Sequence, residues 1–187
     1  MNYPEYTHIY QICLLPTHDE ELSEQMQKSC NKMHPGIMYR HALSNNTEWE
    51  STMDCFISQC KIEQQVPILH LDMHGFEKGL GKESNDYIDW ENLICKITEL
   101  NIACDGKLFL SLNVCKGLLI YNNLFNNSYP LAFRTIGSFD NINANEGTQR
   151  FLAMYEEYFK NNDMNESIST FFKQPKYRLE GGDFELV

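Results

Sequence analysis

Residues 66–75 read VPILHLDMHG. They form a mainly apolar run that ends at a histidine followed by glycine. A second stretch, KLFLSLNVCKG at residues 107–117, has the same design and ends at a cysteine that lies two residues before a glycine. Both stretches therefore predict a strand that ends in a chemically reactive residue, His74 in the first and Cys115 in the second.

On either side of these two stretches, short apolar runs alternate with longer amphipathic segments along the chain. The runs that predict strands are residues 9–15, 37–42, 66–73, 107–114 and 130–136. The segments that predict helices are residues 19–33, 47–64, 90–100, 118–125 and 145–160. Apolar runs without polar alternation are typical of parallel strands that are covered on both faces. The pattern therefore predicts an α/β three-layer sandwich with a mostly parallel central sheet of about six strands.

The chain of 187 residues has the length of one domain with a substantial core. It contains no internal repeat, no low-complexity linker and no change of composition that would divide it. We therefore expect a single domain over residues 1–187, with its core at about residues 9–160 and a C-terminal extension at residues 161–187.

Charge and hydropathy exclude several classes of function. The formal net charge is −11 and the acidic residues are spread along the chain, so the basic face that phosphate binding requires is missing. No apolar run reaches the roughly 18 residues of a membrane span, and residues 1–8 lack the pattern of a signal peptide. We therefore expect a cytosolic protein that binds neither nucleic acid nor a membrane.

The seven cysteines do not form a recognisable framework. Their number is odd, their spacing is irregular and no two of them form a CxxC pair. This pattern argues against a set of disulfides and against a structural zinc site. Most of the cysteines are expected to be reduced and buried, so a reactive one must be identified by its surroundings.

Parallel sheets bind their ligands beyond the carboxyl ends of the strands. Because His74 and Cys115 each end a strand, we expect them at the same edge of the sheet. A thiol nucleophile needs a base for its proton and N–H donors for the oxyanion that forms on attack. His74 and Cys115 are therefore predicted to form a catalytic dyad, and the backbone N–H groups of Gly75 and Cys115 to form the oxyanion hole. This chemistry requires no metal and no other cofactor.

The order of these motifs resembles that of caspase-like cysteine proteases, the clan CD group that includes CHAT-type domains. The matching segments are ILHLDMHG (68–75), DWENLICKITELN (89–101), LFLSLNVCKG (108–117) and PLAFRTIGSFD (130–140), followed by a helix with FLAMYEEYF. The resemblance covers about residues 9–160. It implies a cysteine endopeptidase that hydrolyses peptide bonds in a protein or peptide substrate, with Cys115 as nucleophile and His74 as general acid and base.

The sequence departs from this family around the nucleophile. It reads LNVCKG where caspases carry a Gln-Ala-Cys-Arg-Gly run, and CHAT-type domains often carry Ser-Ala-Cys. Cys115 follows His74 by 41 residues, against about 50 in caspases. These departures argue against aspartate specificity more than against Cys115 as the nucleophile.

Two other functions fit the same residues. His70, Asp72 and His74 alternate along one strand and share a face, so they form an H-x-D-x-H pattern able to bind zinc or iron in a metal-dependent hydrolase. Alternatively, the chain is a catalytically silent, caspase-like adaptor. Asp72 fits either an orienting partner of an imidazole or a surface carboxylate, and we favour the surface carboxylate.

The segment after the His-Gly pair, FEKGLGKESNDY at residues 76–87, contains Gly79 and Gly81 and several polar residues. We predict that it is a mobile loop beside the site, and an ordinary surface loop is the alternative. An unregulated protease would endanger its host, so we expect low basal activity and an activating protein or ligand that orders this loop. Asp89 then caps the following helix.

Overall fold

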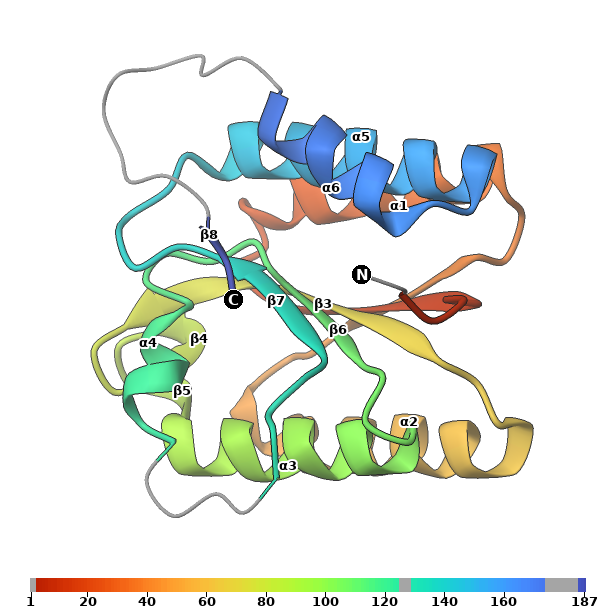
Figure 1. Ribbon diagram of the computed structural model, residues 1–187. Coiled ribbons are helices and arrows are strands. Elements are labelled where there is room, and N and C mark those ends of the chain that lie inside the picture. Colours follow the sequence, from red (N-terminus) through yellow and green to blue (C-terminus); the bar gives the residue numbers. More distant parts are fainter. Residues whose placement is uncertain (1–2, 125–128, 174–184) are drawn as a thin grey trace.

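The computed structural model describes residues 3–124, 129–173 and 185–187. A central β-sheet lies between two layers of helices (Figure 1). Across the sheet the strands follow in the order β2 (Met38–Ala42), β1 (His8–Leu14), β3 (Pro67–Phe76), β6 (Phe109–Leu112), β7 (Arg134–Gly137) and β8 (Glu185–Leu186). These neighbours pair in parallel except for β8, which is antiparallel to β7. The predicted three-layer α/β sandwich with a mostly parallel sheet is confirmed.

Helices cover both faces of the sheet. One layer consists of α1 (Glu20–Met33), α5 (Ala144–Asn161) and α6 (Met164–Lys173), and the opposite layer consists of α2 (Trp49–Glu63) and α3 (Trp90–Ala103) (Figure 1). Two short helices complete the set, a 3-10 helix (Asn46–Glu48) before α2 and α4 (Leu119–Asn122) after β6. This double covering explains why the central strands are apolar on both faces.

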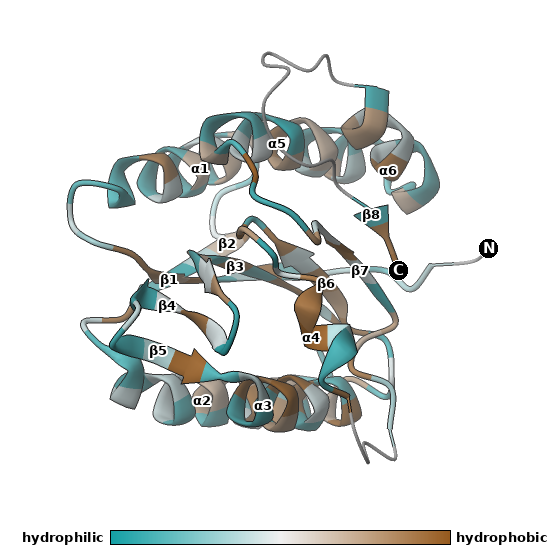
Figure 2. Cartoon of the chain, turned by 90° about the vertical axis from the view of Figure 1, so that its left-hand side faces the viewer, coloured by the Kyte–Doolittle hydropathy of each residue, from teal (hydrophilic) through white to brown (hydrophobic). Residues whose placement is uncertain are grey.

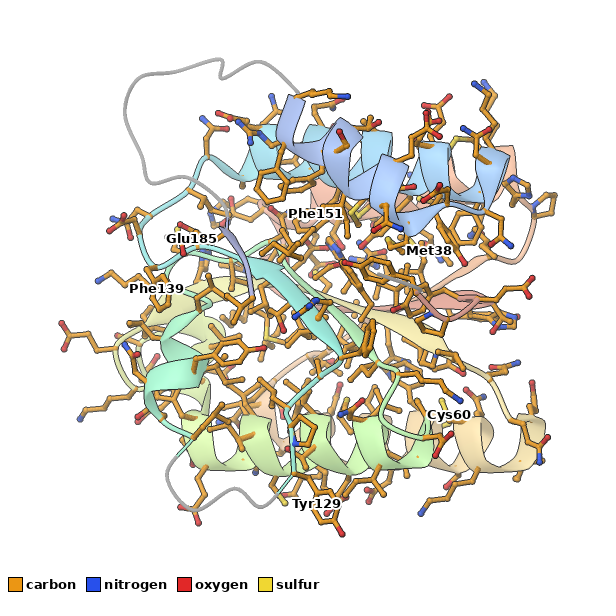
Figure 3. All side chains as sticks on the ribbon, in the orientation of Figure 1. Met38, Cys60, Tyr129, Phe139, Phe151 and Glu185 are labelled. Atoms are coloured by element: carbon orange, nitrogen blue, oxygen red, sulfur yellow. The ribbon has the colours of Figure 1, made fainter. Side chains whose placement is uncertain are left out.

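Alternation along the strands divides the core into two clusters. In β1, Ile9 belongs to the cluster beneath α1, α5 and α6, whereas Tyr10 and Ile12 belong to the cluster that faces α2 and α3. Figure 2 shows hydrophobic residues on the strands and polar residues on the outer helix surfaces. Figure 3 labels fully buried residues of both clusters, among them Phe151 on α5 and Cys60 on α2. Burial of each large apolar side chain stabilises the fold by about 1.5–3 kcal/mol.

Most predicted helices and strands agree with the structure to within a few residues. The Oδ1 atom of Asp89 accepts a hydrogen bond of 2.8 Å from the N–H of Asn92, so Asp89 caps α3 as predicted. β7 and α4 are shorter than the segments predicted for them. The last residue of the predicted helix at 118–125, Phe125, lies outside the described residues.

The C-terminal extension contributes to the core. α6 packs against α5, and its residues Met164, Ile168 and Phe171 are buried in the cluster beneath this layer. The chain then adds β8 to the edge of the sheet beside β7. Residues 174–184 of the predicted extension lie outside the described residues.

The segment predicted as a mobile loop, residues 76–87, is a β-hairpin, so that prediction is wrong. Its two strands, which follow β3, are β4 (Gly79–Glu83) and β5 (Asp86–Asp89). The two glycines permit close contact between strands. A Cβ atom on Gly79 would lie 2.0 Å from the backbone oxygen of Ile88, and one on Gly81 would lie 2.4 Å from that of Asp86. Glycine here indicates tight strand packing instead of a loop.

Candidate active site

His74 and Cys115 lie at the same edge of the sheet, as predicted. β3 and β6 are parallel neighbours (Figure 1); His74 lies near the carboxyl end of β3 and Cys115 follows that of β6. Both residues line one pocket with a volume of about 210 Å³. Its other walls come from the turn between β1 and α1 and from the first turns of α1 and α5. The topology thus brings two residues that are distant in sequence to one cavity.

The backbone of Gly75 lies directly against the backbone of Cys115. A Cβ atom at position 75 would lie 1.5 Å from the carbonyl oxygen of Cys115 and 2.5 Å from its carbonyl carbon. No side chain fits this space unless the turn that carries Cys115 moves. Position 75 therefore has to be glycine, because its backbone lies so close to that of Cys115. These are the two backbone segments that were predicted to form the oxyanion hole.

The turn that carries Cys115 is fixed by its own backbone. Lys116 has a left-handed conformation with φ of 55°, and its N–H donates to the carbonyl oxygen of Asp140 at 2.8 Å. A Cβ atom on Gly117 would lie 2.5 Å from a methyl carbon of Val114, so glycine at this position serves packing. Among the described residues, no acceptor binds the N–H of Cys115. That N–H is free to donate to an oxyanion.

The thiol of Cys115 is half-buried and meets the loop before α5. The N–H of Ile142 donates to Sγ at 3.4 Å, and Sγ lies 3.8 Å from the carbonyl oxygen of Ile142. All seven cysteines are free, and Cys115 alone among them lines the pocket. Burial raises the pKa of Cys13 to about 11 and that of Cys30 to about 12, so these two thiols stay protonated at neutral pH.

His74 is held by a carboxylate that the sequence analysis did not single out. Its Nε2 atom lies 3.2 Å from Oδ2 of Asp19, and Nε2 of His18 lies 3.4 Å from the same oxygen. The side chains of His74 and Asp19 are 42% and 39% exposed, so water reaches this pair. Asp19 stands in the turn between β1 and α1, and β1 is the neighbour of β3. The sequence feature that could have indicated this contact is the position of Asp19, shortly after the first predicted strand at residues 9–15.

No hydrogen bond joins His74 to Cys115 in the part of the chain that the structure describes. The ring of His74 binds Asp19, and the thiol of Cys115 binds the backbone of Ile142. Catalytic hydrogen bonds are often long in free enzymes and tighten when substrate binds. The two residues are therefore placed at one pocket without being engaged with one another.

Asp72 is buried, so the prediction of a surface carboxylate is wrong. It is 3% exposed, and it accepts hydrogen bonds from Nε2 of Gln11 at 2.7 Å and from Nδ2 of Asn113 at 2.9 Å. Nε2 of His70 lies 3.3 Å from Oδ1 of Asp72. Burial alone would raise the pKa of Asp72, but His70 and these hydrogen bonds outweigh it and hold the pKa below its usual range. The face of β3 that carries Asp72 is covered by helices instead of water.

The alternating residues His70, Asp72 and His74 do not converge on a common point. Both ring nitrogens of His70 are occupied, Nδ1 by the hydroxyl of Tyr155 at 2.8 Å and Nε2 by Asp72. His74 binds Asp19 instead. Within residues 3–124, 129–173 and 185–187, no three His, Cys, Asp or Glu side chains gather in a way that would hold a metal ion. This geometry gives no support to the H-x-D-x-H metal site.

A scan against protein-family models finds no match for this chain, and a search of curated proteins finds no significant match. Within the described residues, no helix has both the length and the apolar character that crossing a membrane requires. The functional interpretation therefore depends on the sequence motifs and on the geometry of the pocket.

Proposed function

We propose that this chain is a cysteine endopeptidase of the caspase-like kind, with Cys115 as nucleophile and His74 as general acid and base. The observation that carries the proposal is that His74 and Cys115 line one pocket while the backbones of Gly75 and Cys115 touch. A thiol and an imidazole at one cavity, together with the unpaired backbone N–H of Cys115, are components that acyl transfer requires.

The proposed reaction proceeds through a thioester. His74 accepts the thiol proton as the sulfur of Cys115 attacks the carbonyl carbon of the scissile peptide bond. The N–H groups of Gly75 and Cys115 bind the oxyanion of the tetrahedral intermediate, and His74 returns the proton to the leaving amine. A water molecule, deprotonated by His74, then hydrolyses the thioester and restores the free thiol.

Asp19 has the role of a positioning residue in this scheme. Its carboxylate holds the ring of His74 and stabilises the imidazolium that forms during attack. Because His74 and Cys115 are not hydrogen-bonded in the free chain, substrate or an activating protein or ligand has to bring them together. The β4–β5 hairpin pairs with His74 through Gly81, so a partner bound to this hairpin would act on the site.

The pocket favours a substrate residue with a positive charge. Its walls include Asp19, Glu21 and Asp72, and no Lys or Arg occurs among the described residues that line it. Asn113 also lines the pocket, is 7% exposed, and its Oδ1 atom has no hydrogen-bond donor. A Lys or Arg side chain would supply both the charge and the donors. An aspartate would be repelled, in line with the departure from the caspase sequence around Cys115.

We place this activity in the cytosol. All seven cysteines are free, and four of them are buried. Free thiols persist in compartments that are kept reducing, and a thiol nucleophile requires the same condition.

Digestion of an unbiased peptide library, analysed by mass spectrometry, tests the proposal. The full chain should cleave after Lys or Arg, and Cys115→Ala and His74→Ala should each lower the rate at least about 100-fold while the circular dichroism spectrum stays the same. Cys55→Ala removes an exposed thiol away from the pocket and should cleave as the parent does.

Three outcomes would contradict the proposal. Cleavage that survives both variants, or cleavage lost to a chelator and restored by zinc, would favour a metal-dependent hydrolase. A folded chain that cleaves nothing and whose Cys115 does not react with thiol reagents would favour the adaptor.

A further inference from the structure

We propose that the loop between β7 and α5, residues 138–143, holds the thiol of Cys115 in a resting position and has to shift before this thiol can meet His74. The inference rests on the proposed function, because it concerns the control of the same nucleophile. It identifies an autoinhibitory contact inside the chain, made by the backbone of Ile142, and it identifies the substrate residue that fills the catalytic pocket as the ligand that releases this contact.

The backbone of Ile142 meets both hydrogen-bonding capacities of the thiol. Its N–H donates to Sγ of Cys115 at 3.4 Å, and the thiol donates to its carbonyl oxygen at 3.8 Å. A neutral thiol is a weak donor and a weak acceptor, so this arrangement suits it. A thiolate has no proton to donate, and its charge would lie against the carbonyl oxygen. The position of Cys115 therefore fits the resting thiol and not the attacking thiolate.

Hydrogen bonds fix the first half of this loop to the turn that carries Cys115. The N–H of Lys116 donates to the carbonyl oxygen of Asp140 at 2.8 Å. The N–H of Leu118 donates to the carbonyl oxygen of Ser138 at 3.0 Å. The hydroxyl of Ser138 in turn accepts a hydrogen bond of 3.1 Å from the N–H of Asp140. The loop is therefore held beside the nucleophile.

Ile142 itself is held more weakly than the residues on either side of it. After it, Oδ1 of Asn143 accepts a hydrogen bond of 3.1 Å from the N–H of Glu146 and caps α5. In the part of the chain that the structure describes, the backbone of Ile142 has no hydrogen bond except the two with Cys115. Residues 139–141 are exposed. The thiol is therefore released when two weak contacts with sulfur break, while the anchors on both sides stay in place.

The trigger for this movement lies in the pocket. Ile142 lines the pocket together with His74 and Cys115, so a substrate side chain that fills the pocket meets Ile142 directly. A ligand that binds better when the loop has shifted moves the equilibrium toward the shifted state. The free chain therefore keeps its nucleophile at rest, and substrate binding frees it for His74.

Alkylation of Cys115 by iodoacetamide, followed by mass spectrometry, tests the inference without a substrate. Ile142→Ala and Ile142→Gly both remove the side chain, but only glycine frees the backbone. Cys115 should therefore react about two- to fivefold faster in Ile142→Gly than in Ile142→Ala. Ser138→Ala removes a loop hydrogen bond and should raise the rate about two- to tenfold over the parent. Gln149→Ala, on the exposed side of α5, should react as the parent does.

Amide hydrogen exchange, measured by NMR, reads the contact itself. In Cys115→Ala the N–H of Ile142 loses its acceptor and should exchange about two- to tenfold faster than in the parent. Cys115→Ser keeps an acceptor at this position, so its exchange should be slower than that of Cys115→Ala.

Equal alkylation rates in Ile142→Gly and Ile142→Ala, with an unchanged rate in Ser138→Ala, would overturn the inference. Slower alkylation in these variants would also overturn it, because Ile142 would then activate the thiol. Should Ile142→Gly fail to fold, the exchange of the Ile142 N–H decides the question. Peptide cleavage by a parent whose loop variants react unchanged would reject the resting contact alone. Faster alkylation in Ile142→Gly without any peptide cleavage would keep the contact and reject the peptidase.

Discussion

Two residues near His74, Asp19 and Gly75, shape the geometry of the proposed site. Asp19 holds one ring nitrogen at 3.2 Å, and Gly75 leaves room for the carbonyl group of Cys115. Neither residue reacts with substrate through its own side chain. Asp19 fixes the orientation of the His74 ring, and Gly75 allows the turn that carries Cys115 to lie close to β3. Substitutions of Asp19 and Gly75 therefore test the geometry of the site while His74 and Cys115 stay in place.

Asp19→Asn should lower kcat by about tenfold to a hundredfold. This loss is smaller than the rate enhancement of about 10²–10⁴-fold that a general base supplies, because His74 itself remains. An amide has nearly the size of the carboxylate but cannot stabilise the imidazolium. Asp19→Glu should recover part of the loss, because it restores the charge. His18→Gln is the matched control, since His18 contacts the same oxygen and is 80% exposed. An unchanged kcat in Asp19→Asn would remove Asp19 from the mechanism.

Gly75→Ala should lower kcat by about 100-fold, because it displaces an oxyanion donor, and it should destabilise the fold by about 1–3 kcal/mol through overpacking. Gly106→Ala is the control. Position 106 has φ of 73° and open space around its Cβ, so this variant should lose about 1 kcal/mol of stability without loss of activity. Steady-state kinetics and urea unfolding measure both quantities. Full activity in Gly75→Ala would refute the role of this close approach.

At the scale of the elements, a buried polar network ties β1, β3 and β6 together beneath the pocket. Strand register places Gln11 beside His70 and His70 beside Ser111 on the face that α1 and α5 cover. Asp72 then accepts hydrogen bonds from Gln11 and from Asn113, which follows β6. The floor of the site is thus held by side-chain hydrogen bonds between strands as well as by the backbone ladder.

Asp72→Asn should destabilise the protein at pH 7 by about 1–3 kcal/mol, because it leaves buried donors without a charged acceptor. The pKa of folded Asp72 lies below its ordinary value of 3.8, so its stabilising effect is present above about pH 4 and is lost as the pH falls through the folded pKa. The difference between parent and variant should therefore shrink in acid. Urea unfolding at pH 7, 4 and 3 measures this difference.

The control for this experiment is Asp54→Asn, which breaks an exposed ion pair with Lys96 and should cost at most about 1 kcal/mol. A difference between the parent and Asp72→Asn that stays constant from pH 7 to pH 3 would show that the charge of Asp72 contributes nothing to stability.

Helices and strands with a clear apolar period could be predicted from the sequence, and the β4–β5 hairpin could not. Its short segments contain Gly79 and Gly81, which propensity assigns to loops. In the structure both glycines serve close contacts with the facing strand, and such contacts depend on the pairing partner instead of on local sequence. The burial of Asp72 could not be predicted for a similar reason. Alternation along a strand indicates which residues share a face of the sheet, but it does not indicate whether helices cover that face.

At the scale of the whole molecule, the placement of His74 and Cys115 at one pocket could be predicted because it follows from the topology of the sheet. Two parallel strands that end in reactive residues place them at one edge of the sheet. The contact between His74 and Asp19 could not be predicted, because it depends on β1 being the neighbour of β3 and on the path of the turn that leads into α1. The contribution of α6 to the core could not be predicted either, because it depends on the packing of α6 against α5.

Phe171→Ala should destabilise the whole fold by about 3–5 kcal/mol, because Phe171 is 0% exposed and belongs to the cluster beneath α5 and α6. Phe172 is its neighbour on α6 and is 39% exposed, so Phe172→Ala should cost less than about 1 kcal/mol. Thermal unfolding of the two variants measures the difference. Equal losses would mean that α6 does not dock on the core through Phe171.

Covalent labelling by a peptide electrophile tests whether Cys115 is a nucleophile that His74 activates. A peptidyl chloromethyl ketone with arginine beside the reactive carbon is offered to the full chain, and the adducts are located by mass spectrometry. We predict one adduct at Cys115, which forms at least about tenfold more slowly in His74→Ala, and no adduct at the exposed Cys55 and Cys95 over the same time. Equal labelling of Cys115 in the parent and in His74→Ala, or labelling confined to Cys55 and Cys95, would contradict it.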